Sequence, residues 1–283
     1  MKSRADEALA SIKKAAPQMD IAEMKGRALT FMSELEARKS ALAPSSFAWY
    51  PYNTLSNFLH LDALLTGEHR SLLELIGDKS VVDVGCADGD TAFFLETLGC
   101  TVQTIDYAPT NYNSLQGVRL LKNALSSSVE IHEIDLDAQF LLPQEEYGLV
   151  FFLGILYHLK NPYYALETLA KSCEYCLIST RIAKFSTRNA EYDTRLTKPI
   201  PGKRTDFSHL PIAYLLDERE ANNDSTNYWI FSDTGLRRIL ERTGWDICDF
   251  MTVGNTANSD PASAEGDERA FCLVKSRKRD VQQ

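Results

Sequence analysis

Residues 81–90 constrain the fold of this chain more than any other segment. The apolar run at 81–84 predicts a buried β-strand, and a helix-like run at 91–98 follows almost directly. Between them, Gly85 and Gly89 let the backbone turn sharply and approach a ligand without interference from a Cβ atom. The following helix would present free N–H groups to that ligand. This strand, turn and helix are typical of a nucleoside-cofactor site in an α/β protein.

The spacing of the glycines and the acidic residues in this turn indicates which cofactor it binds. A dinucleotide fingerprint reads Gly-x-Gly-x-x-Gly, whereas this turn reads Gly-x-x-x-Gly and carries Asp83, Asp88 and Asp90. Three carboxylates would repel a pyrophosphate, but they suit the sulfonium, ammonium and ribose hydroxyl groups of S-adenosylmethionine. We therefore expect S-adenosylmethionine rather than NAD.

A second acidic residue supports this expectation. The predicted strand at residues 101–105 ends at Asp106, which follows Asp83 by 23 residues, close to the spacing of a carboxylate that bonds ribose hydroxyls. The alternative is that Asp83 and Asp106 only cap strand ends in another kind of α/β protein.

Four segments carry a resemblance to a known family. They are residues 49–55 (Trp-Tyr-Pro-Tyr-Asn-Thr-Leu), 81–90, 151–162 (Phe-Phe-Leu-Gly-Ile-Leu-Tyr-His-Leu-Lys-Asn-Pro) and 227–232 (Asn-Tyr-Trp-Ile-Phe-Ser). From residue 49 to about residue 275 the chain resembles a class I S-adenosylmethionine-dependent methyltransferase. Within that group it is similar to the tRNA wobble-uridine carboxymethyl-transferring enzymes and their uncharacterised relatives. It departs from their pattern at Ala87, where a glycine is usual, and at Leu159 and Lys160, where the tRNA enzymes carry paired arginines.

The resemblance implies which residues contact the cofactor. They are Asp83, Gly85, Cys86, Ala87 and Gly89 at the methionine end, Leu153 and Gly154 beneath the sulfonium, Asp106 and Tyr107 at the ribose, and Asp135 and Leu136 at the adenine. Trp49 corresponds to a tryptophan near the cofactor, although it could equally serve helix packing. Arg269 stands where the tRNA enzymes hold an arginine implicated in gripping a carboxylated cofactor. One arginine does not establish carboxyl transfer, so ordinary S-adenosylmethionine is expected.

Methyl transfer from a sulfonium needs positioning above all, and it needs a base only when the acceptor must lose a proton. His158 is the candidate base because it follows the fourth predicted strand and has an ordinary pKa near neutrality. The alternative is a structural role for His158, as a strand cap or a partner of the Asn161 turn. Tyr157 would orient the acceptor or contact the cofactor. Arg181 and Tyr228 are expected to bind the substrate.

The strand pattern predicts an α/β fold: a doubly wound, mostly parallel, seven-stranded Rossmann-like sheet with an antiparallel last pair. The predicted strands are residues 80–84, 101–105, 129–134, 149–153, 175–180, 247–253 and 270–275. The predicted organisation is an N-terminal helical extension (1–48), a cofactor-binding core (49–181), a substrate lid (182–230), a C-terminal helix with the strand pair (231–277) and a tail (278–283). The N-terminal helix shows one apolar face, which would pack on the core or form a homo-oligomer contact.

The charge balance bears on the partner. The net charge is −9, which disfavours a general nucleic-acid binder because phosphate neutralisation supplies most of that affinity. Seven basic residues between Arg181 and Arg204 nevertheless suggest a patch for an anionic acceptor or tRNA, or else a solvated connection. We expect a small-molecule acceptor, with tRNA as the alternative.

The sequence shows no membrane span, no secretory signal and no set of zinc ligands, and these absences predict location and metal content. The longest apolar stretch, residues 149–157, is too short to span a bilayer, and no secretory signal is visible, so a cytoplasmic protein is expected. The six cysteines are expected to be reduced, and the Cys173 and Cys176 pair lacks the partners of a zinc site, so no metal is expected.

Overall fold

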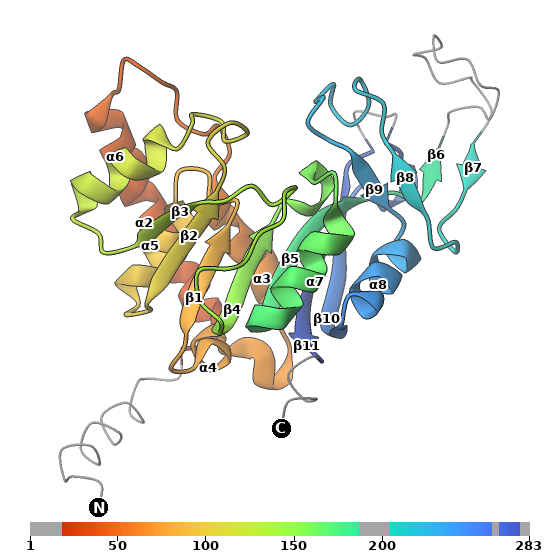
Figure 1. Cartoon of the computed structure of the whole chain (residues 1–283), viewed down its shortest axis with the longest axis horizontal. Coiled ribbons are helices and arrows are strands. Elements are labelled where there is room, and N and C mark those ends of the chain that lie inside the picture. Colours follow the sequence, from red (N-terminus) through yellow and green to blue (C-terminus); the bar gives the residue numbers. More distant parts are fainter. Residues whose placement is uncertain (1–18, 187–203, 262–265, 278–283) are drawn as a thin grey trace, which may run out of the picture.

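The computed structural model describes residues 19–186, 204–261 and 266–277, and the structural statements below concern these residues. A nine-stranded sheet forms the centre of the molecule (Figure 1), and seven of its strands follow the order β10-β11-β5-β4-β1-β2-β3. These strands are β1 (Ser80–Val84), β2 (Val102–Asp106), β3 (Glu130–Glu133), β4 (Tyr147–Leu153), β5 (Cys173–Ile182), β10 (Trp245–Gly254) and β11 (Glu268–Ser276). Strands β1 to β5 pair in parallel, whereas β11 is antiparallel to both β5 and β10. The predicted fold is confirmed.

Helices cover both faces of this sheet (Figure 1), and the strand residues alternate between the two faces as a period of two requires. Phe151 and Leu177 pack against helices of the first face, whereas Phe152 and Ile178 pack against those of the second. The first face holds α2 (Ile21–Leu42), α3 (Asn57–Leu64), α4 (Leu72–Ile76), α5 (Asp90–Thr97) and α6 (Gln116–Leu125), and the second holds α7 (Pro162–Ser172) and α8 (Asp233–Arg242).

The register of the central strands brings the predicted cofactor residues together. In the strand register, Asp83 of β1 lies opposite Thr104 of β2 on one side and opposite Phe151 of β4 on the other. Because the three strands are parallel and in step, their carboxyl ends meet at one edge of the sheet. Ligands bind in the crevice outside this edge in doubly wound sheets.

The apolar face of α2 packs on this chain's own core. Ile21, Met24, Ala28 and Leu35 are buried there, and the Phe31 ring lies 5.9 Å from that of Phe94. Of the two predicted roles, packing on the core or a homo-oligomer contact, these residues serve core packing. The preceding part of the predicted helical region, residues 4–18, lies outside the described residues.

The predicted lid contains short strands that the sequence pattern did not indicate. They are β6 (Phe185–Ser186), β7 (Thr205–Asp206), β8 (Ala213–Leu215) and β9 (Trp229–Phe231). Strand β9 continues the main sheet by pairing with the end of β5, where Phe231 lies opposite Ile182. A small separate cluster of apolar residues supports this region: Ala183, Phe207, Leu216, Ala221 and Ile230. Residues 187–203 of the predicted lid lie outside the described part.

Two further observations concern the described residues. No helix among them is both long and apolar enough to cross a membrane. No group of three or more histidine, cysteine, aspartate or glutamate side chains among them could hold a metal ion, and all six cysteines are free thiols.

Candidate active site

The turn after β1 has a backbone that requires its glycines. Gly85 and Gly89 have φ angles of 73° and 86°, in the left-handed region that glycine adopts at little cost. A Cβ atom on Gly85 would clash with Ile155, and one on Gly89 would lie 2.7 Å from a methyl carbon of Val118. Ala87 also has a positive φ of 52°, which explains why a glycine is usual at this position. The thiol of Cys86 is buried, and this burial raises its pKa.

Asp106 joins the turn after β1 to the loop after β2. Its Oδ2 accepts hydrogen bonds from the Ala87 N–H and the Asn111 side-chain amide, both at 3.0 Å, and its Oδ1 accepts from the Tyr107 N–H at 2.8 Å. Burial raises the pKa of Asp106, although these hydrogen bonds oppose the shift. Asp106, predicted to bind the ribose, therefore lies directly against Ala87 of the predicted methionine end. Tyr107 is bonded to the same carboxylate through its N–H.

Asp83 is the acidic residue of this turn whose charge is least compensated. The residue is only 7% exposed. Burial, together with the nearby carboxylates of Asp106 and Asp90, raises the pKa of Asp83 to about 7. A cationic ligand group beside Asp83 would relieve this unfavourable charge.

Asp88 and Asp90, whose charge the sequence counted toward a cationic ligand, have an internal cation. Both bind the Lys39 ammonium of α2, at 3.1 Å and 2.8 Å. Asp88 also accepts hydrogen bonds from the Tyr50 N–H and the Asn113 side chain. The turn therefore offers less negative charge to a ligand than its composition suggests.

Trp49 lies at the end of α2, close to this turn. Its indole N–H donates to the Lys39 carbonyl oxygen at 3.2 Å, and the Lys39 ammonium lies 5.5 Å from its ring centre. The Phe47 ring meets it edge-on at 5.1 Å. These contacts give Trp49 a packing role, and the backbone N–H of the next residue, Tyr50, bonds Asp88 of the turn.

The predicted adenine residues follow β3. The Asp135 carboxylate accepts from the Asp137 N–H at 2.9 Å, Leu136 is buried, and the Ile134 N–H bonds the Asp106 carbonyl oxygen at 3.0 Å. The loop that carries Asp135 and Leu136 is thereby held beside β2 and its carboxylate.

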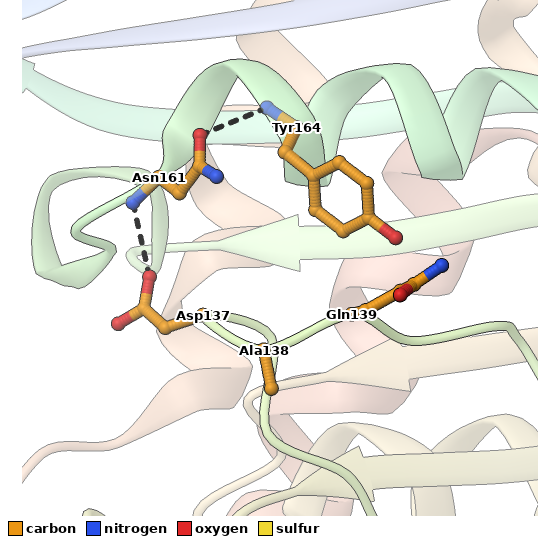
Figure 2. Close-up of a pocket in the computed structure, with 5 residues that line it drawn as sticks. All are labelled: Asp137, Ala138, Gln139, Asn161 and Tyr164. Carbon is orange, nitrogen blue, oxygen red and sulfur yellow. Dashed lines mark hydrogen bonds between the residues drawn. The ribbon is translucent and has the colours of Figure 1, made fainter.

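A shallow pocket lies next to this loop (Figure 2). Its lining consists of Asp137, Ala138, Gln139, Asn161 and Tyr164, and it includes none of the predicted cofactor residues. Asp137 accepts from the Asn161 N–H at 3.0 Å, and the Asn161 side chain caps α7 by accepting from the Tyr164 N–H. These bonds connect the loop after β3 to the start of α7 at the pocket.

The end of β4 brings together the predicted sulfonium residues and Tyr157. The Gly154 N–H donates to the Ser179 carbonyl oxygen of β5, and Leu153 is half-buried against the core. A Cβ on Gly154 would lie 3.7 Å from the Tyr157 hydroxyl, so this hydroxyl lies close to Gly154. The same hydroxyl lies 3.4 Å from Nη1 of Arg269.

Tyr50, from the segment after α2, completes this side of the site. Burial and the adjacent hydroxyl of Tyr157 raise the pKa of Tyr50 to about 12, and Arg269 opposes this shift. The two tyrosines and Arg269 therefore form one polar group between the turn after β4 and the start of β11.

His158 is tied to the lid through one ring nitrogen. Its Nδ1 lies 3.1 Å from both the carbonyl oxygen and the hydroxyl oxygen of Thr226. Since a carbonyl oxygen only accepts, Nδ1 carries the hydrogen, and Nε2 carries the free lone pair. Burial lowers the pKa of His158, so the ring is neutral at pH 7 and can accept a proton. Its structural and catalytic roles are therefore compatible.

The two predicted substrate residues differ in exposure. Arg181 is only 2% exposed, and its Nε lies 3.0 Å from the Asp267 carboxylate. Tyr228 is half-buried, its N–H donates to the Tyr157 carbonyl oxygen at 2.8 Å, and the Lys160 ammonium lies 5.6 Å from its ring centre. Tyr228 thus joins the predicted lid to the turn that holds Tyr157 and His158.

The described basic residues of the suggested patch have partners within the protein. Lys184 pairs with the buried carboxylate of Glu268 at 3.0 Å, and the Arg204 guanidinium stacks 3.2 Å from the Phe185 ring centre. With Arg181 paired to Asp267, all three described basic residues have internal partners. The other four lie outside the described residues: Arg188, Arg195, Lys198 and Lys203.

Three features meet at the carboxyl edge of one doubly wound sheet: a glycine turn after β1, a carboxylate after β2 and a polar turn after β4. Together they define a nucleoside-cofactor enzyme of the methyltransferase class. The family model described as a methyltransferase domain matches residues 58–249. Because this match spans more than half of the chain, the chain belongs to the methyltransferase domain family. The predicted enzyme class is confirmed.

Solved structures show the same fold at low sequence identity. The N-terminal domain of EvdMO1, solved with S-adenosylhomocysteine bound, is 14% identical, with a TM-score of 0.51 and coverage of 87% of this chain and 96% of that domain. An S-adenosylmethionine-dependent methyltransferase from Mesorhizobium loti is 16% identical, with a TM-score of 0.50 and coverage of 78% of this chain and 97% of that protein. No curated protein matches the sequence.

Sequence reasoning missed several residues that build the site. Lys39, Asn111 and Asn113 hold the acidic side chains of the two cofactor loops, and no motif indicated them. Tyr50 belongs to the aromatic segment of the family resemblance, so its position beside the first motif carried a usable signal.

Proposed function

We propose that this methyltransferase transfers the methyl group of S-adenosylmethionine to an oxygen or nitrogen of a small-molecule acceptor. The observation that carries the proposal is His158, a neutral imidazole with a free Nε2 next to Tyr157 at the carboxyl end of β4. The bound S-adenosylhomocysteine of the EvdMO1 domain, which shares this fold, supports the cofactor.

The residues divide the work between binding and proton transfer. Asp83 would attract the ammonium group of the cofactor, and Asp106 would accept from the ribose hydroxyls. The cofactor supplies an activated methyl group, so the protein mainly has to hold the acceptor in line with it. Tyr157 would orient the acceptor, and Nε2 of His158 would remove its proton.

Mass spectrometry of the ligand that co-purifies with the protein tests the cofactor. We expect S-adenosylmethionine or S-adenosylhomocysteine. Recovery of a carboxylated cofactor would contradict simple methyl transfer, and recovery of NAD would contradict the whole assignment. Incubation with methyl-labelled cofactor and metabolite extracts then identifies the acceptor by the label that it gains.

The alternative substrate is the wobble uridine of tRNA. The Gly-Ile-Leu-Tyr-His segment at residues 154–158 favours it. The ion pairs of Arg181 and Lys184 with Asp267 and Glu268 weigh against it, because phosphate binding needs exposed basic groups. Arg204 is exposed and does not count against it. Fluorescence anisotropy with labelled tRNA at low salt separates the two: salt-dependent binding would favour tRNA, and its absence the small molecule.

A further inference from the structure

Lys39 connects the N-terminal helix to the turn after β1. Its ammonium lies between two carboxylates, 3.1 Å from Asp88 and 2.8 Å from Asp90. The three side chains are 12%, 1% and 10% exposed, so they are largely withdrawn from water. A buried ionised group is costly unless it is paired and hydrogen-bonded. Lys39 therefore compensates two of the three carboxylates in the turn.

Asp88 extends this ion pair into a network that spans both cofactor loops. The oxygen that Lys39 reaches also accepts from the Tyr50 N–H at 2.9 Å, and the other oxygen accepts from the Asn113 side-chain amide at 2.7 Å. The Asn113 side chain further bonds the Ala48 carbonyl oxygen and the Gly117 N–H, at 3.3 Å and 3.0 Å. One buried carboxylate thus holds together α2, residues 48–50, the turn after β1 and the loop after β2.

The backbone of α6 approaches this carboxylate closely at Gly117. A Cβ atom on Gly117 would clash with the Asp88 carboxylate. The adjacent residue of the turn, Ala87, is held from the other side by Asp106. The conformation of the turn therefore depends on contacts at both ends, and only the Asp88 end contains a cation.

We propose that Lys39 is a positioning residue for the cofactor site, an inference that rests on the proposed use of S-adenosylmethionine. Lys39 fixes residues 85–90 in the conformation that receives the cofactor. It also neutralises Asp88 and Asp90, so Asp83 is the one carboxylate of the turn that faces the cofactor's ammonium group without a cation of its own. Lys39 acts through Asp88 and does not touch the reacting atoms.

The test compares Lys39→Met with Lys39→Arg and with a control on the same helix, Lys25→Met. Lys25 also forms an ion pair, with Asp62 at 2.5 Å, but that pair is separate from the cofactor turn. Calorimetry measures the Kd for S-adenosylhomocysteine, and kinetics separate the KM for S-adenosylmethionine from kcat. We expect Lys39→Met to raise Kd and KM about tenfold or more, the effect of losing a hydrogen bond between charged groups, with kcat changed less than about twofold. Lys39→Arg should retain most of the affinity, and Lys25→Met should resemble the wild type.

Unchanged affinity in a folded Lys39→Met variant would overturn the inference while leaving the proposed function standing. A wild-type protein that binds neither S-adenosylmethionine nor S-adenosylhomocysteine would instead refute the proposed function, and the inference with it. If Lys39→Met does not fold, the double variant Lys39→Met with Asp90→Asn decides. It removes one of the two buried charges that lose their cation, and the other, Asp88, keeps its hydrogen bonds from Tyr50 and Asn113. We expect the double variant to fold and to bind S-adenosylhomocysteine more weakly than the wild type. Wild-type affinity would show that Lys39 only balances charge, and would overturn the positioning role.

Discussion

At the residue scale, Asp83 should control how stability and cofactor affinity change with pH. Its pKa of about 7 in the folded protein exceeds the value of about 3.9 in an unfolded chain. The folded state therefore holds the proton more tightly. This contribution to stability is complete below pH 4 and is lost as the pH rises through 7. The cofactor's ammonium prefers the ionised carboxylate, so affinity should rise over the same interval.

The variant Asp83→Asn separates these two effects. Without an ionisable group at this position, the ligand-free protein should lose less stability between pH 6 and pH 8 than the wild type does. Its affinity for S-adenosylhomocysteine should be lower at pH 8 and nearly independent of pH. Thermal unfolding and calorimetry at both pH values measure these quantities. Equal pH dependence in variant and wild type would assign the titration to another group.

His158 should affect turnover and leave cofactor binding unchanged. If Nε2 removes the acceptor's proton, His158→Ala should lower kcat by about 100-fold or more, the usual contribution of a general base. Because the pKa of His158 lies below its ordinary value, kcat of the wild type at saturating cofactor should fall only on the acidic side of that ordinary value. Single-turnover kinetics and calorimetry provide the two measurements. Unchanged turnover would show that His158 has only a structural role, through its contact with Thr226.

Some site residues were predictable because their role is local. Gly85 and Gly89 follow a strand directly, and a sharp turn there needs their positive φ angles. Lys39 was not predictable, since helical periodicity does not reveal a partner that lies 49 residues away in the sequence. The sequence counted the charge of Asp88 toward the turn, whereas in the fold this carboxylate accepts internal hydrogen bonds from Lys39, Tyr50 and Asn113.

At the scale of elements, patterns with a buried periodic face were predicted well. All seven main strands form, with β5 and β11 longer than the patterns at 175–180 and 270–275 suggested. Arg181 and Glu268 lie in these extra strand residues, and charged residues do not suggest a buried strand. In the fold each is paired, Arg181 with Asp267 and Glu268 with Lys184. The short strands β6 to β9 were missed because two or three residues carry no periodicity. Their pairing also depends on distant segments: β6 pairs with β7, β8 with β9, and β9 with β5.

Ser232 joins the lid to α8, so its loss should destabilise both elements. It is fully buried, and its hydroxyl oxygen accepts from the Gly235 N–H at 2.9 Å and from the Ile212 N–H at 3.1 Å. Ser232→Ala removes the cap of α8 and leaves the Ile212 N–H with one partner fewer. We expect the free energy of unfolding to fall by about 1–2 kcal/mol.

Urea denaturation measures this loss, and Ser225→Ala, at an exposed serine of the preceding segment, serves as the control. Cofactor affinity should remain at the wild-type value, because Ser232 contacts neither cofactor loop. A free energy of unfolding equal to that of the control would contradict the joint role of Ser232.

At the scale of the molecule, distant segments meet around one cofactor edge. The N-terminal helix reaches it through Lys39, and the C-terminal strand reaches it through Arg269 beside Tyr157. The sheet edge between them is formed by β1, β2 and β4. The edge is therefore connected to segments from both ends of the described chain, and ligand binding there should stabilise the fold as a whole.

Thermal unfolding with and without ligand tests this coupling. At a concentration of about 100 times its Kd, S-adenosylhomocysteine should stabilise the folded state by about 2.7 kcal/mol, which raises Tm by roughly 5–10 °C for a domain of this size. NAD at the same concentration should leave Tm unchanged, because the turn after β1 lacks the glycine spacing that receives a pyrophosphate. The shift should appear as one transition that includes the N-terminal helix, since Lys39 binds the cofactor turn. A separate, ligand-insensitive transition for that helix would contradict the coupling, and a shift with NAD would contradict the cofactor assignment.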